Sequence, residues 1–475
     1  MRRHVIALAC APILISMLAA AAGIAQRPTI GNAVRTFVKT DAPVVALTHV
    51  RVIDGTGAPA RENQTLVIRD GLIAAVGPDV PVPADAQVID ATGKSVFPGL
   101  VMLHEHLYYP TGPNVYGQLG ISFSRLYLAG GVTTMRTGGN VNGFMDLALA
   151  ERASKFEIAS PAIDATAPYL NGPNTQLQMH ALKDADDARQ QVAYWAAMGA
   201  TSFKAYMQIT KAELGAAIEE AHKRGLKVTG HLCSVTYAEA AALGIDNLEH
   251  GFAAATDFVA TKQPDICPGQ GQGQQTITAL DASGQPFQQL VKTLVDRKVA
   301  LTSTLTVFET FTPGRPMPPG VDVLMPSLKD QYVQTHQRTS QNQNSSYATL
   351  FPKMMKLEYA FAKAGGLLVA GTDPTGSGGV IPGYANQRQL ELLVEEGFTP
   401  LEAITIGTLN GAKYLGRDRQ IGSIAVGKQA DLVLVAGDPS RLITDVRNVD
   451  TVFRQGVGFD PAKLIQSVTG RVGIW

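Results

Sequence analysis

Two histidines, His104 and His106, stand one residue apart directly after the apolar residues 97–103. Because side chains alternate along a β-strand, both imidazoles would face the same side and could chelate one metal ion. A His-x-His pair also arises by chance, so the pair alone is weak evidence for a metal site. Its meaning depends on what other ligands the chain could bring to the same place.

Further residues with metal-binding chemistry lie in or just after predicted strands: Lys204, His231, His250 and Asp373. Taken singly, Lys204 could be a solvated lysine, each histidine a hydrogen-bonded core residue and Asp373 a helix cap. Each, however, falls at the carboxyl end of its own strand, which is where barrel enzymes place catalytic groups. This shared position argues against separate structural explanations and predicts one composite site.

The middle of the chain alternates short apolar segments with amphipathic stretches, as in a parallel α/β fold. In the clearest unit, Thr210 and Glu213 form a capping box, Gly225 ends the helix, and the next strand begins at residue 227. The expected strands cover residues 96–103, 132–136, 162–165, 201–206, 227–230, 247–250, 299–305 and 367–371. Eight such strands favour a closed (β/α)8 TIM barrel over residues 98–419.

Both ends of the chain are rich in short strands separated by turn residues. The expected strands are residues 44–53, 64–69, 72–76 and 87–90, then 422–424, 432–435 and 449–453. We therefore expect residues 43–97 and 420–470 to build one composite β-sandwich domain. Residues 254–290 and 315–326 fit neither a helical nor a strand period, and we expect them to be surface or lid loops.

Composition favours a globular protein that acts on a small molecule. The chain has 475 residues, of which 45% are hydrophobic and 17% charged, so it can bury a large core. Lys+Arg and Asp+Glu are equal at 40 each, and this balance gives no reason to expect a nucleic acid or an anionic membrane as partner. A homo-oligomer is compatible with this composition, but the sequence does not fix the oligomeric state.

The first 25 residues are expected to be a secretory signal peptide. Arg2 and Arg3 precede the apolar residues 5–22, and small residues follow. The alternative is an uncleaved membrane anchor. Cleavage would export the protein to the periplasm or the medium with no stable membrane association. Only Cys233 and Cys267 would then remain, and the sequence leaves open whether they form a disulfide.

Several motifs together resemble the amidohydrolase superfamily, in its binuclear form with a bridging carboxylated lysine. The subgroup they resemble most includes imidazolonepropionase-like, Xaa-Pro-dipeptidase-like and ochratoxinase-like members, and the resemblance covers nearly all of the chain after the signal peptide. The motifs are the segment from Phe97 to His106, Gly130-Gly131-Val132-Thr133-Thr134, Ala370-Gly371-Thr372-Asp373, Gly407-Thr408-Leu409-Asn410-Gly411-Ala412, and the segment from Gly422 to Leu432.

The resemblance implies two divalent metal ions, with zinc favoured over manganese or cobalt. His104, His106 and Asp373 would hold the more buried ion, and His231 and His250 the more exposed one. A carbamate formed on Lys204 from carbon dioxide would bridge them. A metal-bridging hydroxide would attack an amide carbonyl, with Asp373 as general base and then general acid.

Substrate contacts are expected from Tyr206, two residues after Lys204, and from Tyr169 and Asn171 after the third strand. Core packing is the alternative for these residues. Prolidase-like members usually carry a Gly-His pair where this chain has Asn171-Gly172-Pro173-Asn174, which puts proline specificity in doubt.

The expected function is hydrolysis of a linear amide, either a dipeptide or an N-acyl amino acid. One alternative is a cyclic-amide hydrolase of imidazolonepropionase or hydantoinase type, and another is a deaminase on the same barrel. Lys204 argues against a mononuclear deaminase, which does not need a strand lysine. The intact set of six ligands disfavours a non-catalytic binding protein.

Overall fold

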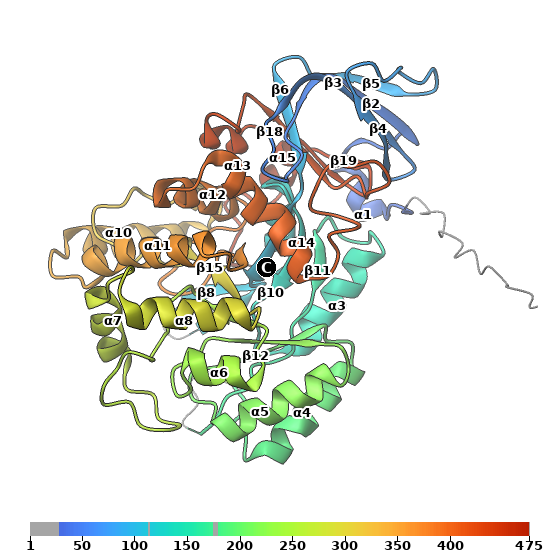
Figure 1. Ribbon diagram of the computed structural model, residues 1–475. Helices are drawn as coiled ribbons and strands as arrows, with labels where there is room; N and C mark the ends of the chain where they lie inside the picture. Colours follow the sequence, from blue (N-terminus) through green and yellow to red (C-terminus); the bar gives the residue numbers. More distant parts are fainter. Residues whose placement is uncertain (1–27, 113–114, 174–178, 475) are drawn as a thin grey trace, which may run out of the picture.

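The computed structural model describes residues 28–112, 115–173 and 179–474. Its centre consists of parallel strands in two sheets (Figure 1). One sheet has the order β11 (Ala162–Asp164), β10 (Val132–Thr137), β7 (Leu100–Glu105). The other runs β12 (Ser202–Ala205), β13 (Lys227–Gly230), β14 (Asn247–Glu249), β15 (Ala300–Ser303), β16 (Leu368–Ala370). The predicted mixed α/β fold with a parallel core is confirmed.

Backbone contacts link the two sheets at both ends. Parallel bridges join Thr166 to Ser202 and Leu170 to Ala205, between the segments that contain β11 and β12. On the other side, the N–H groups of Thr372 and Asp373 donate to the His104 carbonyl at 3.1 and 3.0 Å. Gly371 permits this approach, because a Cβ atom there would lie 2.4 Å from the Cβ of His104. The segment after β16 therefore lies against β7.

One expected strand is divided. Residues 96–103 were expected to be a single strand, but β6 (Lys94–Pro98) and β7 belong to different sheets. Pro98 has no N–H to donate to a ladder, and the N–H of Gly99 donates to the Asp431 carbonyl at 2.8 Å. The Pro98-Gly99 step thus carries the chain from one sheet into the other.

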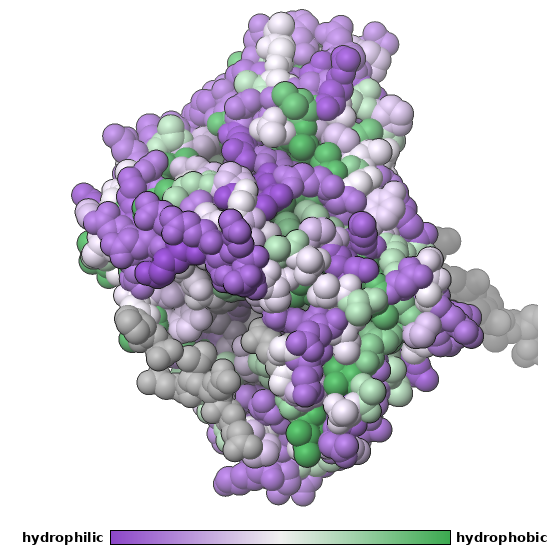
Figure 2. Space-filling model, turned by 90° about the vertical axis from the view of Figure 1, so that its left-hand side faces the viewer, coloured by the Kyte–Doolittle hydropathy of each residue, from purple (hydrophilic) through white to green (hydrophobic). Residues whose placement is uncertain are grey.

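The helices pack around the parallel strands (Figure 1). They include α4 (Ala185–Ala197), α5 (Lys211–His222), α6 (Tyr237–Leu243), α11 (Tyr347–Lys363) and α12 (Tyr384–Glu396). The capping box of Thr210 and Glu213 at the start of α5 is present as predicted. Hydrophilic residues cover most of the face shown in Figure 2, which fits a chain that buries its apolar residues.

The expectation of a long loop at residues 254–290 is wrong in part. This stretch contains α7 (Gln270–Ala279) and the first residues of α8 (Gln285–Asp296). The helix α7 is rich in Gln and Gly and has no apolar period to reveal it. The helix α8 does have an apolar period, formed by the buried residues Phe287, Leu290 and Leu294. This period begins only at the end of residues 254–290.

Strands from both ends of the chain share one nine-stranded sheet, which lies at the top of Figure 1. The early strands are β1 (Val38–Thr40), β2 (Val44–Val52), β3 (Arg61–Arg69), β4 (Leu72–Gly77), β5 (Gln87–Asp90) and β6. The late ones are β17 (Leu432–Ala436), β18 (Val449–Arg454) and β19 (Val457–Phe459). The antiparallel pairing of β17 with β6 joins the two ends. Residues 422–424, which were expected to be a strand, belong to no strand: residues 422 and 423 form bends and residue 424 has no regular secondary structure.

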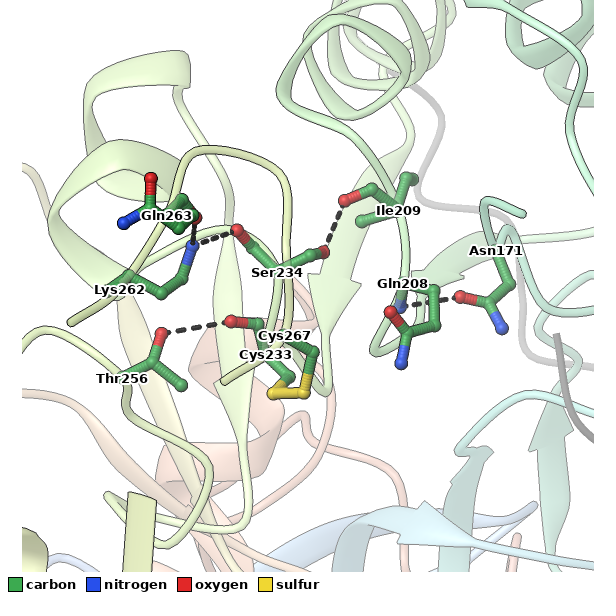
Figure 3. Close-up of a disulfide and its surroundings, with 9 residues drawn as sticks. All are labelled: Asn171, Gln208, Ile209, Cys233, Ser234, Thr256, Lys262, Gln263 and Cys267. Carbon is green, nitrogen blue, oxygen red and sulfur yellow. Dashed lines mark hydrogen bonds between the residues drawn. A yellow bond between two sulfur atoms is a disulfide. The ribbon is translucent and has the colours of Figure 1, made fainter. Parts of the chain in front are cut away.

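Cys233 and Cys267 form a disulfide with a Cα–Cα distance of 4.9 Å, which answers the question that the sequence left open. It ties the segment after β13 to the residues before α7 (Figure 3). The expected signal peptide, residues 1–25, lies outside the described residues. Within the described part of the chain, no helix is both long and apolar enough to cross a membrane.

Candidate metal centre

All six predicted metal ligands line one cavity of about 390 Å³. His104 lies in β7 and His106 one residue beyond it, Lys204 lies in β12, and His231 and His250 directly follow β13 and β14. Asp373 comes three residues after the end of β16. Because parallel strands present their carboxyl ends at the same edge, six residues that are far apart in the sequence meet at this cavity.

The donor atoms lie within a few ångströms of one another. The Lys204 Nζ atom is 3.3 Å from His104 Nε2, and Asp373 Oδ1 is 3.3 Å from His106 Nε2. Asp373 Oδ2 lies 3.8 Å from His250 Nδ1. His104, His250 and Asp373 each offer one possible ligand atom, and these three atoms lie within 4.8 Å of one another, as a shared metal ion would require. The ring of His231 lies next to that of His250, with 4.4 Å between the centroids.

Hydrogen bonds from the far side of the rings fix which imidazole nitrogens face the cavity. Nδ1 of His104 lies 2.7 Å from Glu249 Oε2, and Nδ1 of His106 lies 3.0 Å from the Gly139 carbonyl oxygen. These oxygens only accept, so each Nδ1 carries the hydrogen and each Nε2 keeps its lone pair for a metal. The hydroxyl of Thr304 contacts Nδ1 of His250 at 2.8 Å.

Two of the ligands have a left-handed backbone. The φ angles are +67° at His250 and +55° at Asp373. Such conformations are uncommon for residues other than glycine and collect at functional sites, where the surrounding structure must hold them. His250 directly follows β14 and Asp373 comes three residues after β16, so the chain turns after these strands and aims both side chains at the cavity.

Burial keeps the histidines neutral. It lowers the pKa of His106 to about 4 and the pKa of His231 to about 3, and it lowers the pKa values of His104 and His250 as well. Burial also lowers the pKa of Lys204 to about 8, against the opposing effect of Glu249 and Asp373. Neutral imidazoles and a readily deprotonated amine are the forms that can bind a metal or react with carbon dioxide.

The carboxylate of Asp373 stays ionised. Its burial alone would raise its pKa, but the neighbouring imidazoles outweigh that effect and hold the pKa well below its usual value. Imidazole nitrogens together with a carboxylate form a donor set that suits a divalent transition metal such as zinc. The residues present therefore fit the metal ions that the sequence predicts.

Sequence reasoning missed a buried ion pair behind the ligands. Glu249, which is fully buried, accepts hydrogen bonds from Arg136 at 2.8 and 3.2 Å through Oε1 and contacts His104 through Oε2. Arg136 also donates to the Leu103 carbonyl and the Thr229 hydroxyl. The pair and its partners join four strands of the parallel core, β7, β10, β13 and β14, and orient His104. A charged residue inside a short apolar strand was the available signal.

Tyr169 and Tyr206, the predicted substrate contacts, both line the cavity, with ring centroids 5.0 Å apart. Tyr108 was missed. Its ring stacks on His106 at 4.5 Å, and its hydroxyl lies 2.6 Å from that of Tyr169. Strand alternation from His104 and His106 could have placed Tyr108 on the same face. Asn171 is buried elsewhere and accepts a hydrogen bond from the backbone N–H of Gln208 (Figure 3).

Comparisons with known proteins agree with this geometry. Residues 315–458 match the amidohydrolase family. The enamidase of Eubacterium barkeri is 39% identical over 85 residues, which make up 18% of this chain and 22% of the enamidase. The matched segment thus spans only about a fifth of that relative.

Two solved structures share the fold over most of their length. A putative prolidase from Bifidobacterium longum has a TM-score of 0.67 and 24% identity, over 88% of this chain and 95% of the prolidase. A Xaa-Pro dipeptidase with bound methionine has a TM-score of 0.65 and 18% identity, over 88% of this chain and 100% of the dipeptidase. The predicted resemblance to amidohydrolases is confirmed.

Proposed function

We propose that this chain, whose residues 315–458 belong to the amidohydrolase family, is a metal-dependent hydrolase that cleaves a carbon–nitrogen bond in a linear amide. The observation that carries the proposal is the meeting of four imidazoles, one lysine and one carboxylate in one cavity at the ends of the parallel strands. We include in the proposal a closed (β/α)8 barrel over residues 98–419 and a composite β-sandwich domain formed by residues 43–97 and 420–470.

His104, His106 and Asp373 would hold one divalent ion, and His231 and His250 the other. Lys204, as a carbamate, would contribute oxygen donors between them, and its pKa of about 8 supports that reaction because a neutral amine is required. Two bound divalent ions, most readily zinc, would supply a Lewis acid for the amide carbonyl and would lower the pKa of a bound water.

The residues of the chain have separable tasks in this scheme. Asp373 is ionised and lies at the centre of the imidazoles, so its Oδ atoms can take a proton from the attacking water and deliver it to the leaving nitrogen. Arg136 and Glu249 hold the ring of His104 in place. The rings of Tyr169 and Tyr206 form a wall against which the substrate can be oriented.

Dipeptides and N-acyl amino acids were the linear amides expected from the sequence, and the fold shared with a putative prolidase and a Xaa-Pro dipeptidase supports a linear amide. A cyclic-amide hydrolase or a deaminase is the second candidate. The short matches to an enamidase and to dihydroorotases favour the cyclic-amide hydrolase within this second candidate. Because Lys204 lies among the imidazoles, a mononuclear deaminase fits less well than a ring hydrolase.

The proposal also includes export after removal of residues 1–25. In that case, the amino-terminal sequence of protein from the producing cells should begin at Gln26, or at Gly23 where the cut follows Ala22. An intact Met1 would count against cleavage.

The test of the metal centre is the Lys204→Ala variant. Without the lysine no carbamate can form, so bound zinc should fall well below two ions per chain, as measured by elemental analysis of dialysed protein. Lys211→Ala, at an exposed lysine near the start of α5, is the control and should keep the full metal content. Unchanged metal content in Lys204→Ala would remove the bridging role and, with it, the binuclear hydrolase.

A further inference from the structure

We infer that the cavity beside the candidate metal centre accepts amides with an uncharged, aromatic or apolar group where dipeptides and N-acyl amino acids carry a free carboxylate. This inference rests on the proposed function and narrows its substrate class. It is carried by the walls of the cavity, which are aromatic on two sides and offer no cation beyond the candidate metal ligands among the described lining residues.

The first wall consists of four tyrosines: Tyr108, Tyr116, Tyr169 and Tyr206. The rings of Tyr108 and Tyr116 meet edge to face at 5.4 Å, and those of Tyr169 and Tyr206 lie 5.0 Å apart. The hydroxyls of Tyr108 and Tyr169 are 2.6 Å apart, so one of them donates to the other. This wall presents ring faces and a neutral hydroxyl pair, which suit an aromatic group or a carbonyl oxygen.

The second wall comes from α9 (Leu305–Glu309), from Phe311 and from the start of α11. Val307 and Phe308 project from α9, and Tyr347 begins α11. The ring of Tyr347 lies 5.3 Å from Phe311 and 6.2 Å from Phe308. The hydroxyl of Tyr347 accepts a hydrogen bond from Gln274 at 3.0 Å. The rings of Phe308, Phe311 and Tyr347 therefore line the cavity, and that of Phe308 also contacts the ring of His250, with 5.9 Å between the centroids.

The charges near the cavity are unsuited to a carboxylate. Of the described lining residues, the only ammonium group is that of Lys204 and the only imidazoles are the four candidate ligands. Arg315, which follows Phe311 in the chain, donates to both Glu309 and Glu395. Residues 113–114 and 174–178 contain no Lys, Arg or His. A carboxylate on the substrate would therefore lose its hydration without gaining a cationic side chain as partner.

The size of the cavity fits this substrate class. A volume of about 390 Å³ lies within the range of small-molecule sites and leaves room on both sides of a scissile amide. Apolar groups gain free energy when they leave water for such walls, whereas an unpaired anion loses it. Discrimination between the two kinds of substrate therefore follows from the wall residues and not from the metal ligands.

Two compounds that differ only in the carboxylate test the inference: N-benzoylphenethylamine and N-benzoylphenylalanine. We expect zinc-loaded protein to release benzoate from the uncharged compound with a kcat/KM higher by about tenfold or more, a factor equivalent to roughly 1.4 kcal/mol. Equal values, or a preference for the carboxylate, would overturn the inference and leave the amide hydrolase standing. Hydrolysis of neither compound would count against the linear-amide function itself.

Binding separates these two failures without turnover. If neither compound is hydrolysed, calorimetric titration of the zinc-loaded unmodified protein should still show tighter binding of N-benzoylphenethylamine than of N-benzoylphenylalanine. A second variant supplies the missing cation: Val115 lines the cavity and is 55% exposed, so Val115→Arg should fold. Relative to the neutral control Val115→Gln, Val115→Arg should bind N-benzoylphenylalanine several-fold more tightly. Tighter binding of N-benzoylphenylalanine to the unmodified cavity would contradict the inference.

Discussion

Two buried glutamates, Glu249 and Glu358, contact the loop around His250, but different residues surround their carboxylates. Glu249 directly precedes His250 and is bonded to Arg136 and His104. Glu358, in α11, contacts the same loop at Gly251. Its Oε1 atom lies so close to this glycine that a Cβ atom there would be only 2.0 Å away. Both side chains are fully buried, so depth alone cannot distinguish them.

The partners decide the charge of each glutamate. Burial acts to raise the pKa of Glu249, but His104, Lys204 and Arg136 outweigh it and hold the pKa well below its usual value. Burial raises the pKa of Glu358 to about 8, and only the nearby Ser303 hydroxyl opposes it. Glu396, at the end of α12, is raised to a pKa of about 11 by its own burial and by Glu358. No cation pairs with either of these two acids among the described residues, and the carboxylate oxygens of both are buried.

The comparison separates two uses of a buried acid. Glu249 is an anion that orients the candidate metal ligand His104, and its charge is balanced by a buried guanidinium. Glu358 and Glu396 lie close enough to influence each other and are neutral near physiological pH. The same residue type therefore supports the candidate metal centre in one place and carries a proton in the other.

Removing Arg136 should give the largest effect. Arg136→Met leaves Glu249 buried without its cation, so the free energy of unfolding should fall by about 3–5 kcal/mol, as measured by urea denaturation. Arg189→Met is the control, because Arg189 pairs with Asp186 on the surface and should contribute at most about 1 kcal/mol. Similar losses in both variants would show that Glu249 does not depend on its guanidinium.

The candidate ligands could be predicted from sequence because they obey local rules. His104 and His106 share a face by strand alternation, and Lys204, His231, His250 and Asp373 mark the ends of separate strands. The parallel strands then bring them together at their carboxyl ends without further information. The parts of the fold that rest on periodicity, such as α5 with its capping box, were likewise predicted correctly.

What the sequence could not reveal depends on contacts between distant segments. Arg136 and Glu249 are 113 residues apart, and each lies within a short strand that is buried throughout. The helix α7 is polar on most of its surface, so no apolar period predicted it. The protonation of Glu358 depends on the absence of a partner in the packed core, which no local pattern encodes.

Glu249→Gln should weaken metal binding by about 10- to 100-fold, the range expected when the partner of a ligand histidine is altered. The amide keeps the shape but loses the anionic acceptor for Nδ1 of His104. Zinc affinity can be measured by competition with a chromophoric chelator. Glu358→Gln is the matched control, because it changes a glutamate near the same loop without touching a ligand, and its zinc affinity should be unchanged. Equal losses in the two variants would mean that the loop responds to any change behind it.

The last contrast lies in the pH dependence of stability, where the slope against pH is the quantity measured. The pKa of Glu358 rises on folding from about 4.5 to about 8, so within this window the folded protein holds a proton that the unfolded chain has released. Stability should therefore fall as pH rises from 5 to 8, by up to about 1.4 kcal/mol per pH unit from this group. In Glu358→Gln that contribution is lost, and urea denaturation at several pH values should show a flatter slope. Glu151→Gln, at an exposed glutamate paired with Lys155, should keep the slope of the unmodified protein. Parallel slopes for all three proteins would mean that Glu358 is ionised in the core, and the contrast with Glu249 would disappear.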